Sequence, residues 1–216
     1  MRRRGRGFRG IQLIPKPTTG RGAIVELVVI VALAIGLALG IQAFVVKPYQ
    51  IPSESMEPTL DVGQRVLVNR VSTRLGSDPK PGDVVVFHPP EGAVNGRNCG
   101  GPKEPGQPCP TETPEEASEN FIKRVVAGPG DTLSIKGGIP IVNGEPFEGD
   151  FDIRPCRGIG GCDFPKEITI PPDHYFMMGD NRGASDDSRY WGPVPRDWII
   201  GEAFFTYWPP DRIGFL

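Results

Sequence analysis

A long apolar run near the start of the chain is followed by many short apolar segments. Residues 27–46 form a stretch of twenty residues in which Gln42 is the single polar side chain. A helix of about twenty residues spans roughly 30 Å, the thickness of the hydrocarbon core of a bilayer. The pattern predicts one membrane-spanning helix over residues 24–46, with a buried core helix as the alternative.

A cleaved signal peptide is a second alternative for this run. The apolar region of a signal peptide is about 7–15 residues long and ends at a small-x-small cleavage site. The run here is longer, and residues 47–50 contain no such site, so we expect an uncleaved anchor. Six arginines and Lys16 stand before the run against Glu26 alone. This bias predicts a single-pass protein of the cell membrane, with residues 1–23 in the cytoplasm and residues 47–216 outside it.

Short β-rich segments, separated by prolines and glycines, dominate residues 47–216. The chain holds 29 glycines and 25 prolines, which suits a loop-rich β protein. The predicted strands are residues 65–69, 84–88, 121–127, 132–135, 167–170, 175–178 and 199–208, and an Asn-Gly turn follows residue 142. We therefore expect a mainly β fold, antiparallel and partly closed, attached to one N-terminal transmembrane helix.

Two excursions interrupt the strand pattern. Residues 89–120 are rich in Pro, Gly, Glu and Thr and are expected to form an exposed insertion, and the glycine-rich residues 144–165 are expected to form a small cap. Each excursion holds two of the four cysteines, namely Cys99, Cys109, Cys156 and Cys162. Four cysteines allow three pairings, of which a local pair in each excursion is the simplest. Free thiols are the alternative, although disulfides persist outside the cytoplasm.

The net charge and the counts of histidine and cysteine argue against two classes of function. The chain carries a net charge of −2 although its first 26 residues are strongly basic, so the remainder is acidic. An acidic body argues against a groove for nucleic acid. Two histidines and the absence of a Cys-x-x-Cys pair argue against a zinc site.

The segment Ile51–Leu60, with the sequence IPSESMEPTL, places two serines between prolines. Pro52 and Pro58 restrict the backbone and can hold a serine in an exposed position. Ser55 is the ninth residue after the apolar run, and nine residues span at most about 30 Å. We therefore expect Ser55 and its substrate near the outer membrane surface. A serine acts as a nucleophile when a base removes its proton.

Three side chains are candidates for that base. His88 and His174 lie beside proline pairs and show no triad context. Lys123 lies in an otherwise apolar strand whose alternation puts it on the opposite face from Arg124. If Arg124 is solvated, Lys123 points inward, and burial lowers the pKa of its amine until the neutral form can accept a proton. An exposed structural lysine is the alternative.

Four segments, taken in this order after an anchor, resemble the bacterial type I signal peptidases. They are residues 52–60 (PSESMEPTL), 82–87 (GDVVVF), 123–131 (KRVVAGPGD) and 179–189 (GDNRGASDDSR). Each segment alone is a weak indication of the family, but the four segments in this order after a membrane anchor are specific for it. The resemblance covers about residues 24–210, without the insertion.

The resemblance implies a membrane-anchored serine endopeptidase that removes signal peptides from exported preproteins after Ala-x-Ala-type sites. It implies that Ser55 is the nucleophile, that Lys123 is the general base and that an acyl-enzyme forms. The backbone N–H of Ser55 and the hydroxyl of Ser53 would form the oxyanion hole. The hydroxyl of Ser185 would hydrogen-bond and orient the Lys123 amine.

Further residues follow from the same resemblance. The pocket for the substrate's small side chains would be lined by Pro52, Met56, Leu60 and Ile122. Structural ion pairs would join Arg124 to Asp180 and Asp187 to Arg189. The resemblance implies no metal or organic cofactor. It implies preproteins and the lipid bilayer as partners, and it leaves the oligomeric state open.

Two departures from the family pattern and two alternative functions stand beside this assignment. Glu54 occupies a position that is often glycine in the family, and Gly183-Ala184 replaces a common Asp-Asn pair. A non-catalytic envelope protein for binding or assembly, on the same scaffold, is the main alternative. The presence of both Ser55 and Lys123 favours the enzyme. A self-cleaving serine-lysine regulator would be soluble, which the anchor argues against.

Overall fold

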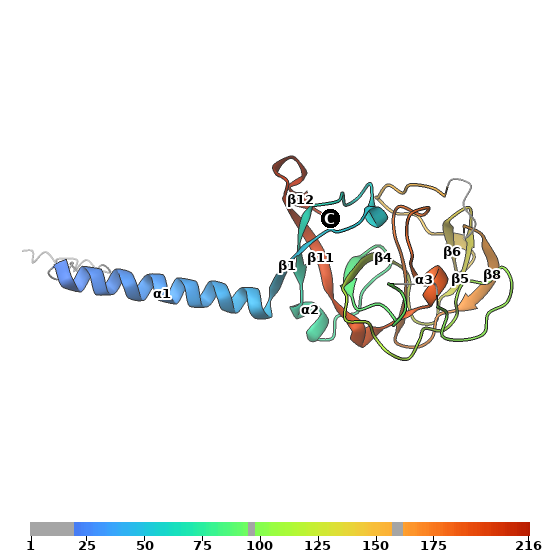
Figure 1. The fold of residues 1–216 in the computed structure, drawn as a ribbon, viewed down its shortest axis with the longest axis horizontal. Coiled ribbons are helices and arrows are strands. Elements are labelled where there is room, and N and C mark those ends of the chain that lie inside the picture. The colour runs from blue at the N-terminus through green and yellow to red at the C-terminus, as the bar shows by residue number, and fades with distance from the viewer. Residues whose placement is uncertain (1–19, 95–97, 157–161) are drawn as a thin grey trace, which may run out of the picture. The chain divides into compact units, whose positions relative to one another are not determined.

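The computed structural model describes residues 20–94, 98–156 and 162–216 (Figure 1). The chain divides into two compact units, residues 1–41 and 42–216. Helix α1, Gly20–Phe44, contains the segment Gly22–Gly40, which is long and apolar enough to cross a membrane. Most of the predicted cytoplasmic segment, residues 1–19, lies outside the described residues.

Helix α1 ends two residues before the predicted end of the span. Val46 instead begins strand β1, Val46–Gln50, where it pairs with Asn69. Pro48 has no backbone N–H and disfavours the helical conformation of the residue before it. The helix therefore stops short of Lys47, and the chain enters the sheet at once.

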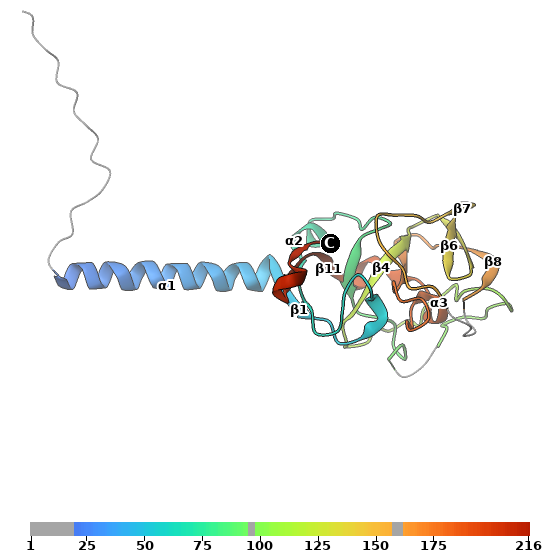
Figure 2. The same ribbon diagram turned by 90° about the horizontal axis from the view of Figure 1, so that it is seen from above.

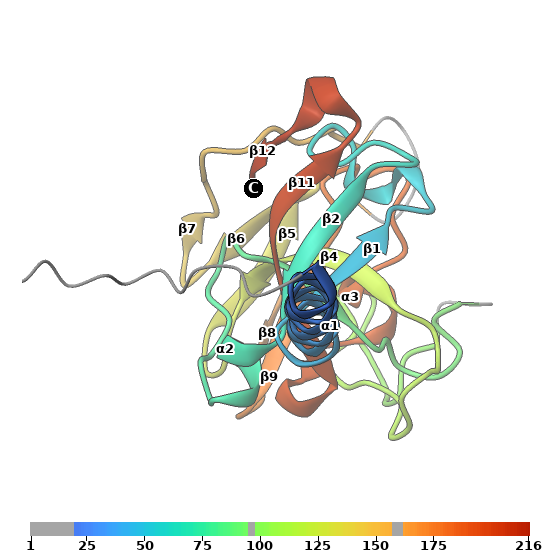
Figure 3. The same cartoon turned by 90° about the vertical axis from the view of Figure 1, so that its left-hand side faces the viewer.

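The larger sheet of the second unit has eight antiparallel strands. Its order is β1-β2-β11-β3-β4-β9-β10, with β12 paired to β11. Figure 3 shows β1, β2 and β11 side by side. The bounds are Arg65–Asn69 (β2), Val84–Phe87 (β3), Phe121–Ala127 (β4), His174–Met178 (β9), Val194–Pro195 (β10), Ile199–Trp208 (β11) and Gly214–Phe215 (β12).

A second sheet of four strands has the order β7-β6-β5-β8. Its strands are Thr132–Lys136 (β5), Ile139–Val142 (β6), Glu145–Pro146 (β7) and Phe164–Thr169 (β8). Asn143 and Gly144 join β6 to β7 with φ of 53° and 85°, as an Asn-Gly hairpin turn requires. Within this unit, Figures 1 and 2 place β6 and β8 at the end opposite β1 and β11. The two sheets confirm the mainly β, antiparallel, partly closed fold.

Two apolar clusters form the core, and β4 contributes to both. The larger cluster joins the two sheets through residues such as Leu133 and Phe176, and it includes Val125 of β4. The smaller cluster includes Ile122 of β4 and packs against the serine segment through Met56. Because apolar side chains cover both of its faces, β4 is a rigid element on which to place a functional group.

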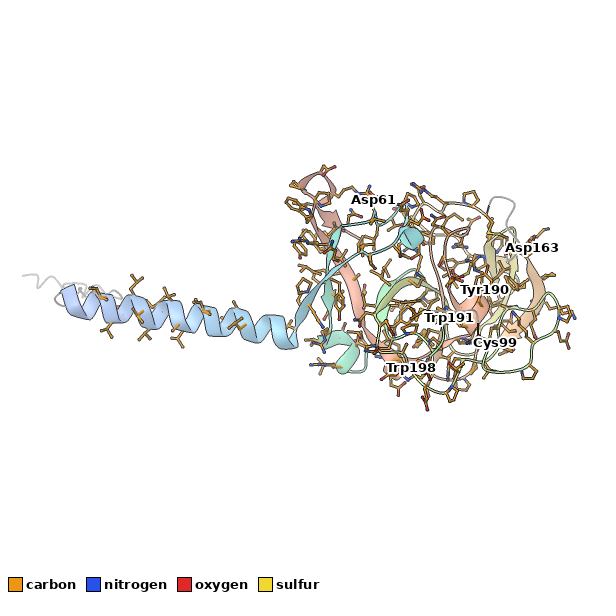
Figure 4. All side chains as sticks on the ribbon, in the orientation of Figure 1. Asp61, Cys99, Asp163, Tyr190, Trp191 and Trp198 are labelled. Carbon is orange, nitrogen blue, oxygen red and sulfur yellow. A yellow bond between two sulfur atoms is a disulfide. The ribbon has the colours of Figure 1, made fainter. Side chains whose placement is uncertain are left out.

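Five short helical elements complete the described structure: α2 at Val71–Arg74, α3 at Ser188–Trp191, and the 3-10 turns η1 at Glu54–Met56, η2 at Arg196–Trp198 and η3 at Pro210–Arg212. Tyr190 and Trp191 project from α3 in Figure 4. Trp191 has no exposed surface, and its ring lies 6.0 Å from that of Phe87. Helix α3 is thus fixed against β3.

Each excursion contains one local disulfide, which confirms the simplest pairing. Cys99 bonds to Cys109, and Cys156 bonds to Cys162. The excursion over residues 144–165 begins with β7 and ends in β8, so both of its ends belong to the smaller sheet. Many described residues of the 89–120 insertion are exposed, but Cys109 is buried against the rest of the unit.

Candidate active site

A 3-10 turn holds Ser55 at the edge of the smaller core cluster. The turn, η1, covers Glu54–Met56, and Ser55 is 6% exposed. The Ser55 carbonyl accepts a hydrogen bond of 3.1 Å from the Asn181 N–H, which ties the turn to the 179–189 segment. The side chain of Glu54 is exposed, so this departure from the family pattern faces solvent.

Strand β4 brings Lys123 to Ser55 although 68 residues separate them along the chain. The Lys123 amine donates a hydrogen bond of 2.7 Å to Ser55 Oγ, and Lys123 is 4% exposed. Burial lowers the pKa of this amine from 10.5 to about 8, against the opposing charges of Asp187 and Asp186. A usable fraction of the amine is therefore neutral near physiological pH.

The premise used to orient Lys123 was wrong in one respect. Arg124 is not solvated but 5% exposed, on the other face of β4. Its guanidinium makes two hydrogen bonds to Asp180, Nε to Oδ1 at 2.9 Å and Nη2 to Oδ2 at 2.7 Å. Both faces of β4 are buried, so strand alternation alone did not show which side chain pointed inward.

Asp187 and Arg189 form a second buried pair behind the serine and lysine. Arg189 Nε lies 2.7 Å from Asp187 Oδ1, and neither side chain has exposed surface. Burial by itself raises the pKa of Asp187, but the charge and hydrogen bonds of Arg189, with a bond from the Gly179 N–H, hold it below its usual value. Asp187 therefore stays negative close to the lysine.

Ser185 is buried, but it does not make the bond that was expected. It is 4% exposed, and no hydrogen bond joins its hydroxyl to the Lys123 amine, which donates to Ser55 Oγ instead. A Cβ added at Gly179 would lie 2.3 Å from Ser185 Oγ and 2.4 Å from the Ser55 carbonyl oxygen. A glycine at position 179 thus allows the two serine-bearing segments to approach each other.

A groove of about 480 Å³ opens at Ser55 and Lys123. Pro52 and Ile122 line it as expected. Met56 and Leu60 do not, because both side chains are fully buried in the smaller core cluster. The sequence analysis missed other residues of the groove, which are Tyr49, Gln50, Ile51, Val86, Ala93, Val94, Asn120, Phe121, Ala184 and Asp186.

Ser53 and the two histidines complete the predicted set. Ser53 lines the groove, and its hydroxyl donates a hydrogen bond of 3.3 Å to Ser55 Oγ. His88 instead contacts the carbonyl oxygen of Glu119 at 3.1 Å, and His174 contacts Glu112 at 3.2 Å. Neither histidine is among the residues that line the groove.

Comparisons with known proteins identify the family of the chain. The family model described as "Signal peptidase, peptidase S26" matches residues 24–208. A signal peptidase I from Leptolyngbya laminosa is 38% identical over 86% of this chain and 80% of its own length. A signal peptidase I from Mycobacterium tuberculosis is 34% identical over 94% of this chain and 78% of its own. A solved signal peptidase I from Enterococcus faecalis aligns at 21% identity over 58% of this chain and 96% of that chain, with a TM-score of 0.36.

The family match and the curated relatives together define the class of enzyme. The chain is a serine endopeptidase, a hydrolase of peptide bonds. It belongs to the type I signal peptidase family, and it acts on signal peptides of preproteins.

Proposed function

We propose that this chain is a membrane-anchored signal peptidase in which Ser55 is the nucleophile and Lys123 is the general base. The observation that carries the proposal is the 2.7 Å between Lys123 Nζ and Ser55 Oγ at a buried position. Serine with lysine is a known variant of the nucleophile-base pair. The lowered pKa of Lys123 supports the same roles, because only the neutral amine can accept a proton.

The reaction follows from these two groups. The neutral Lys123 amine takes the proton of Ser55 Oγ as that oxygen attacks the carbonyl carbon of the substrate. The Ser55 N–H and the Ser53 hydroxyl stabilise the oxyanion, and removal of one such donor costs about 2.7–4 kcal/mol in transition-state energy. The Ser53 side chain is exposed and can rotate from Ser55 Oγ toward the oxyanion.

The lysine then returns its proton. The Lys123 ammonium protonates the leaving nitrogen, the peptide bond breaks, and the acyl-enzyme on Ser55 remains. The neutral amine next deprotonates a water molecule, which attacks the ester carbonyl. The proton passes back to Ser55 Oγ as the ester bond breaks, and the signal peptide leaves with a free carboxylate.

The supporting shell is assigned on the same basis. Asp187 and Arg189 position the segment that carries Ser185, because Arg189 donates hydrogen bonds of 2.8 Å and 2.9 Å to the carbonyl oxygens of Arg182 and Ser185. Ser185 is proposed to orient the Lys123 amine once substrate fills the groove. Pro52 and Ile122 form part of the wall that favours small side chains, such as those of Ala-x-Ala sites.

The proposal is tested on the purified full chain in detergent micelles. The substrate is a synthetic peptide with an apolar segment ending in Ala-x-Ala, and cleavage is followed by mass spectrometry. Ser55→Ala, Lys123→Ala and Lys123→Arg should each abolish cleavage, the last because guanidinium stays protonated. Lys136→Ala is the matched control, because Lys136 is an exposed lysine at the end of β5.

Wild-type turnover by any of the three active-site variants would contradict the assigned roles. No cleavage by the wild-type chain would favour the non-catalytic envelope protein instead. Replacement of the alanine before the cleaved bond by phenylalanine should abolish cleavage by the wild-type chain. Equal cleavage of both peptides would contradict the preference for small side chains.

The proposed topology is a single span that lies within α1 and ends at Phe44, with residues 1–23 in the cytoplasm and the peptidase domain outside. The basic residues before the span support this orientation. Protease added outside intact cells should digest residues 47–216 and leave the preceding segment. Protection of residues 47–216 would reverse the orientation.

A further inference from the structure

The described parts of the insertion over residues 89–120 contact the rest of the unit near both ends and in the middle. Near its two ends, the Ala117 N–H donates a hydrogen bond of 2.7 Å to the Pro89 carbonyl, and Ala93 and Ala117 are buried. In its middle, the Cys109 N–H donates a bond of 3.1 Å to the Arg189 carbonyl of α3. The described parts of the insertion are therefore docked on the peptidase unit at these points.

The insertion also approaches the backbone just after α3. A Cβ added at Gly192 would lie 2.7 Å from the backbone nitrogen of Glu112, and the φ of Gly192 is +94°. Both the space and the backbone conformation require glycine at this point. The contact fixes the middle of the insertion on the element that carries Arg189.

Three residues of the insertion line the catalytic groove, Ala93, Val94 and Asn120, and among them Val94 is the exposed apolar one. Val94 lines the groove together with Ser55 and Lys123. Val94 also lines an adjoining hollow of about 810 Å³, and Ser118 and Glu119 are among the other residues that line this hollow. Because Ser118 and Glu119 lie three and two residues before the first residue of β4, Val94 lies at the end of the groove where β4 begins.

Val94 lies a few residues of extended chain away from the reacting atoms. Asn120, which lines the groove at that end, precedes Lys123 by three residues. A strand rises about 3.3 Å per residue, so roughly 10 Å separates the two positions. An extended substrate has the same rise, so the side chain that meets Val94 stands about two or three residues from the cleaved bond.

We propose that Val94 is a specificity-determining residue, which limits the size of the substrate side chain two or three residues from the cleaved bond. The proposal rests on the proposed function of the groove. Val94 belongs to the insertion over residues 89–120, to which the signal-peptidase resemblance assigns no role. Val94 is 46% exposed and apolar, as suits a wall that a substrate side chain covers on binding.

The test compares Val94→Ala and Val94→Phe with the wild-type chain on a panel of peptides. Each peptide places alanine, valine or leucine at one position, from three residues before the bond to three after it. Val62→Ala is the matched control, because Val62 is 57% exposed and is not among the residues that line the groove.

Val94→Ala should raise the ratio of kcat/KM for leucine over alanine at one position by about tenfold, near the lower limit for a methylene-sized change in a pocket. Val94→Phe should lower the same ratio, and Val62→Ala should leave it unchanged. The changes should fall on KM, with the pH midpoint of kcat/KM unaltered. A general loosening of the fold would instead change the ratio of kcat/KM by a similar factor at every substrate position.

An unchanged ranking in both Val94 variants would overturn the proposal, as would an equal change at every position. Failure of the underlying function is distinguishable from these outcomes. In that case Ser55→Ala would cleave the peptides as the wild type does, or the wild type would cleave none. Thermal unfolding of each variant shows whether it is folded. If Val94→Ala does not fold, a folded Val94→Phe is enough to decide whether Val94 limits the size of the substrate side chain.

Discussion

The pH dependence of cleavage follows from the surroundings of Lys123. Burial lowers the pKa of its amine from 10.5 to about 8, and the charges of Asp187 and Asp186 oppose this shift. Only the neutral amine can take the serine proton. The active fraction of the enzyme therefore rises with pH and reaches half its maximum near the pKa in the free enzyme.

The size of the effect can be worked out from that pKa. With a pKa of about 8, roughly a tenth of the amine is neutral at pH 7 and about a hundredth at pH 6. We expect kcat/KM to fall about tenfold per pH unit below pH 7 and to level off above about pH 9. An ordinary lysine would give a profile that still rises steeply at pH 9.

The assay measures kcat/KM on one synthetic signal peptide at constant ionic strength, with no ionisable side chain near the cleaved bond. Asp186→Asn is the informative variant, because Asp186 lines the groove and its charge favours the ammonium form of Lys123. The midpoint of the variant should move to lower pH. Asp197→Asn is the matched control, because Asp197 is exposed and does not contribute to the pKa shift of Lys123.

Two results would refute this account. A flat profile between pH 6 and 9, or a midpoint near that of an ordinary lysine, would mean that Lys123 is not a buried base. A midpoint that rises in Asp186→Asn would mean that the carboxylate does not favour the ammonium. Stability must be measured at each pH, so that unfolding is not mistaken for titration.

Three further predictions concern the same site. Lys123→Met should be more stable than the wild type at pH 7, and this advantage should shrink by roughly 2–3 kcal/mol by pH 10. The reason is that between pH 8 and 10.5 the unfolded wild-type chain holds a proton on Lys123 that the folded chain has lost, so the wild type gains stability as the pH rises. Urea unfolding of both proteins at pH 7 and pH 10 measures the change. Asp187→Asn should cost about 3–5 kcal/mol in the free energy of unfolding, because it leaves the Arg189 charge buried and unpaired, and an unchanged midpoint would disprove the argument. Ser53→Ala should lower kcat about 100- to 1,000-fold with KM little changed, as stopped-time cleavage assays can show.

The two buried arginine–aspartate pairs have different relations to the reaction. Arg124–Asp180 also receives a hydrogen bond of 2.5 Å from Thr59 Oγ1, so it ties the serine segment to β4. Arg189–Asp187 anchors the carbonyl groups beside Ser185. Buried ion pairs contribute little net stability, because desolvation offsets their attraction. We interpret both pairs as devices that position the site.

Local signals in the sequence predicted much of the fold. Strands β2, β4 and β11 have the bounds expected from their apolar patterns, because each combines β-branched residues with turn residues at its ends. The local disulfides were also predicted correctly, since a short loop limits the choice of partners. Strand β1 was assigned in part to the spanning helix, because its apolar first residue continues the preceding run.

Burial was harder to predict than secondary structure. Met56 and Leu60 follow the serine closely in the chain, yet η1 turns both into the core. Lys123 was expected to point inward if Arg124 was solvated, yet both side chains are buried. A strand pattern shows that two residues face opposite ways, but it does not show whether one face or both are covered.

By itself, the sequence determined the apolar helix, the strands and the residue types able to perform the chemistry, because these depend on neighbours along the chain. Only the tertiary structure decided that Lys123 lies beside Ser55 and that Val94 of the insertion lines the groove. Those contacts join segments many residues apart. They form because β4 packs between two apolar clusters and because the insertion docks on α3, and no local pattern records either event.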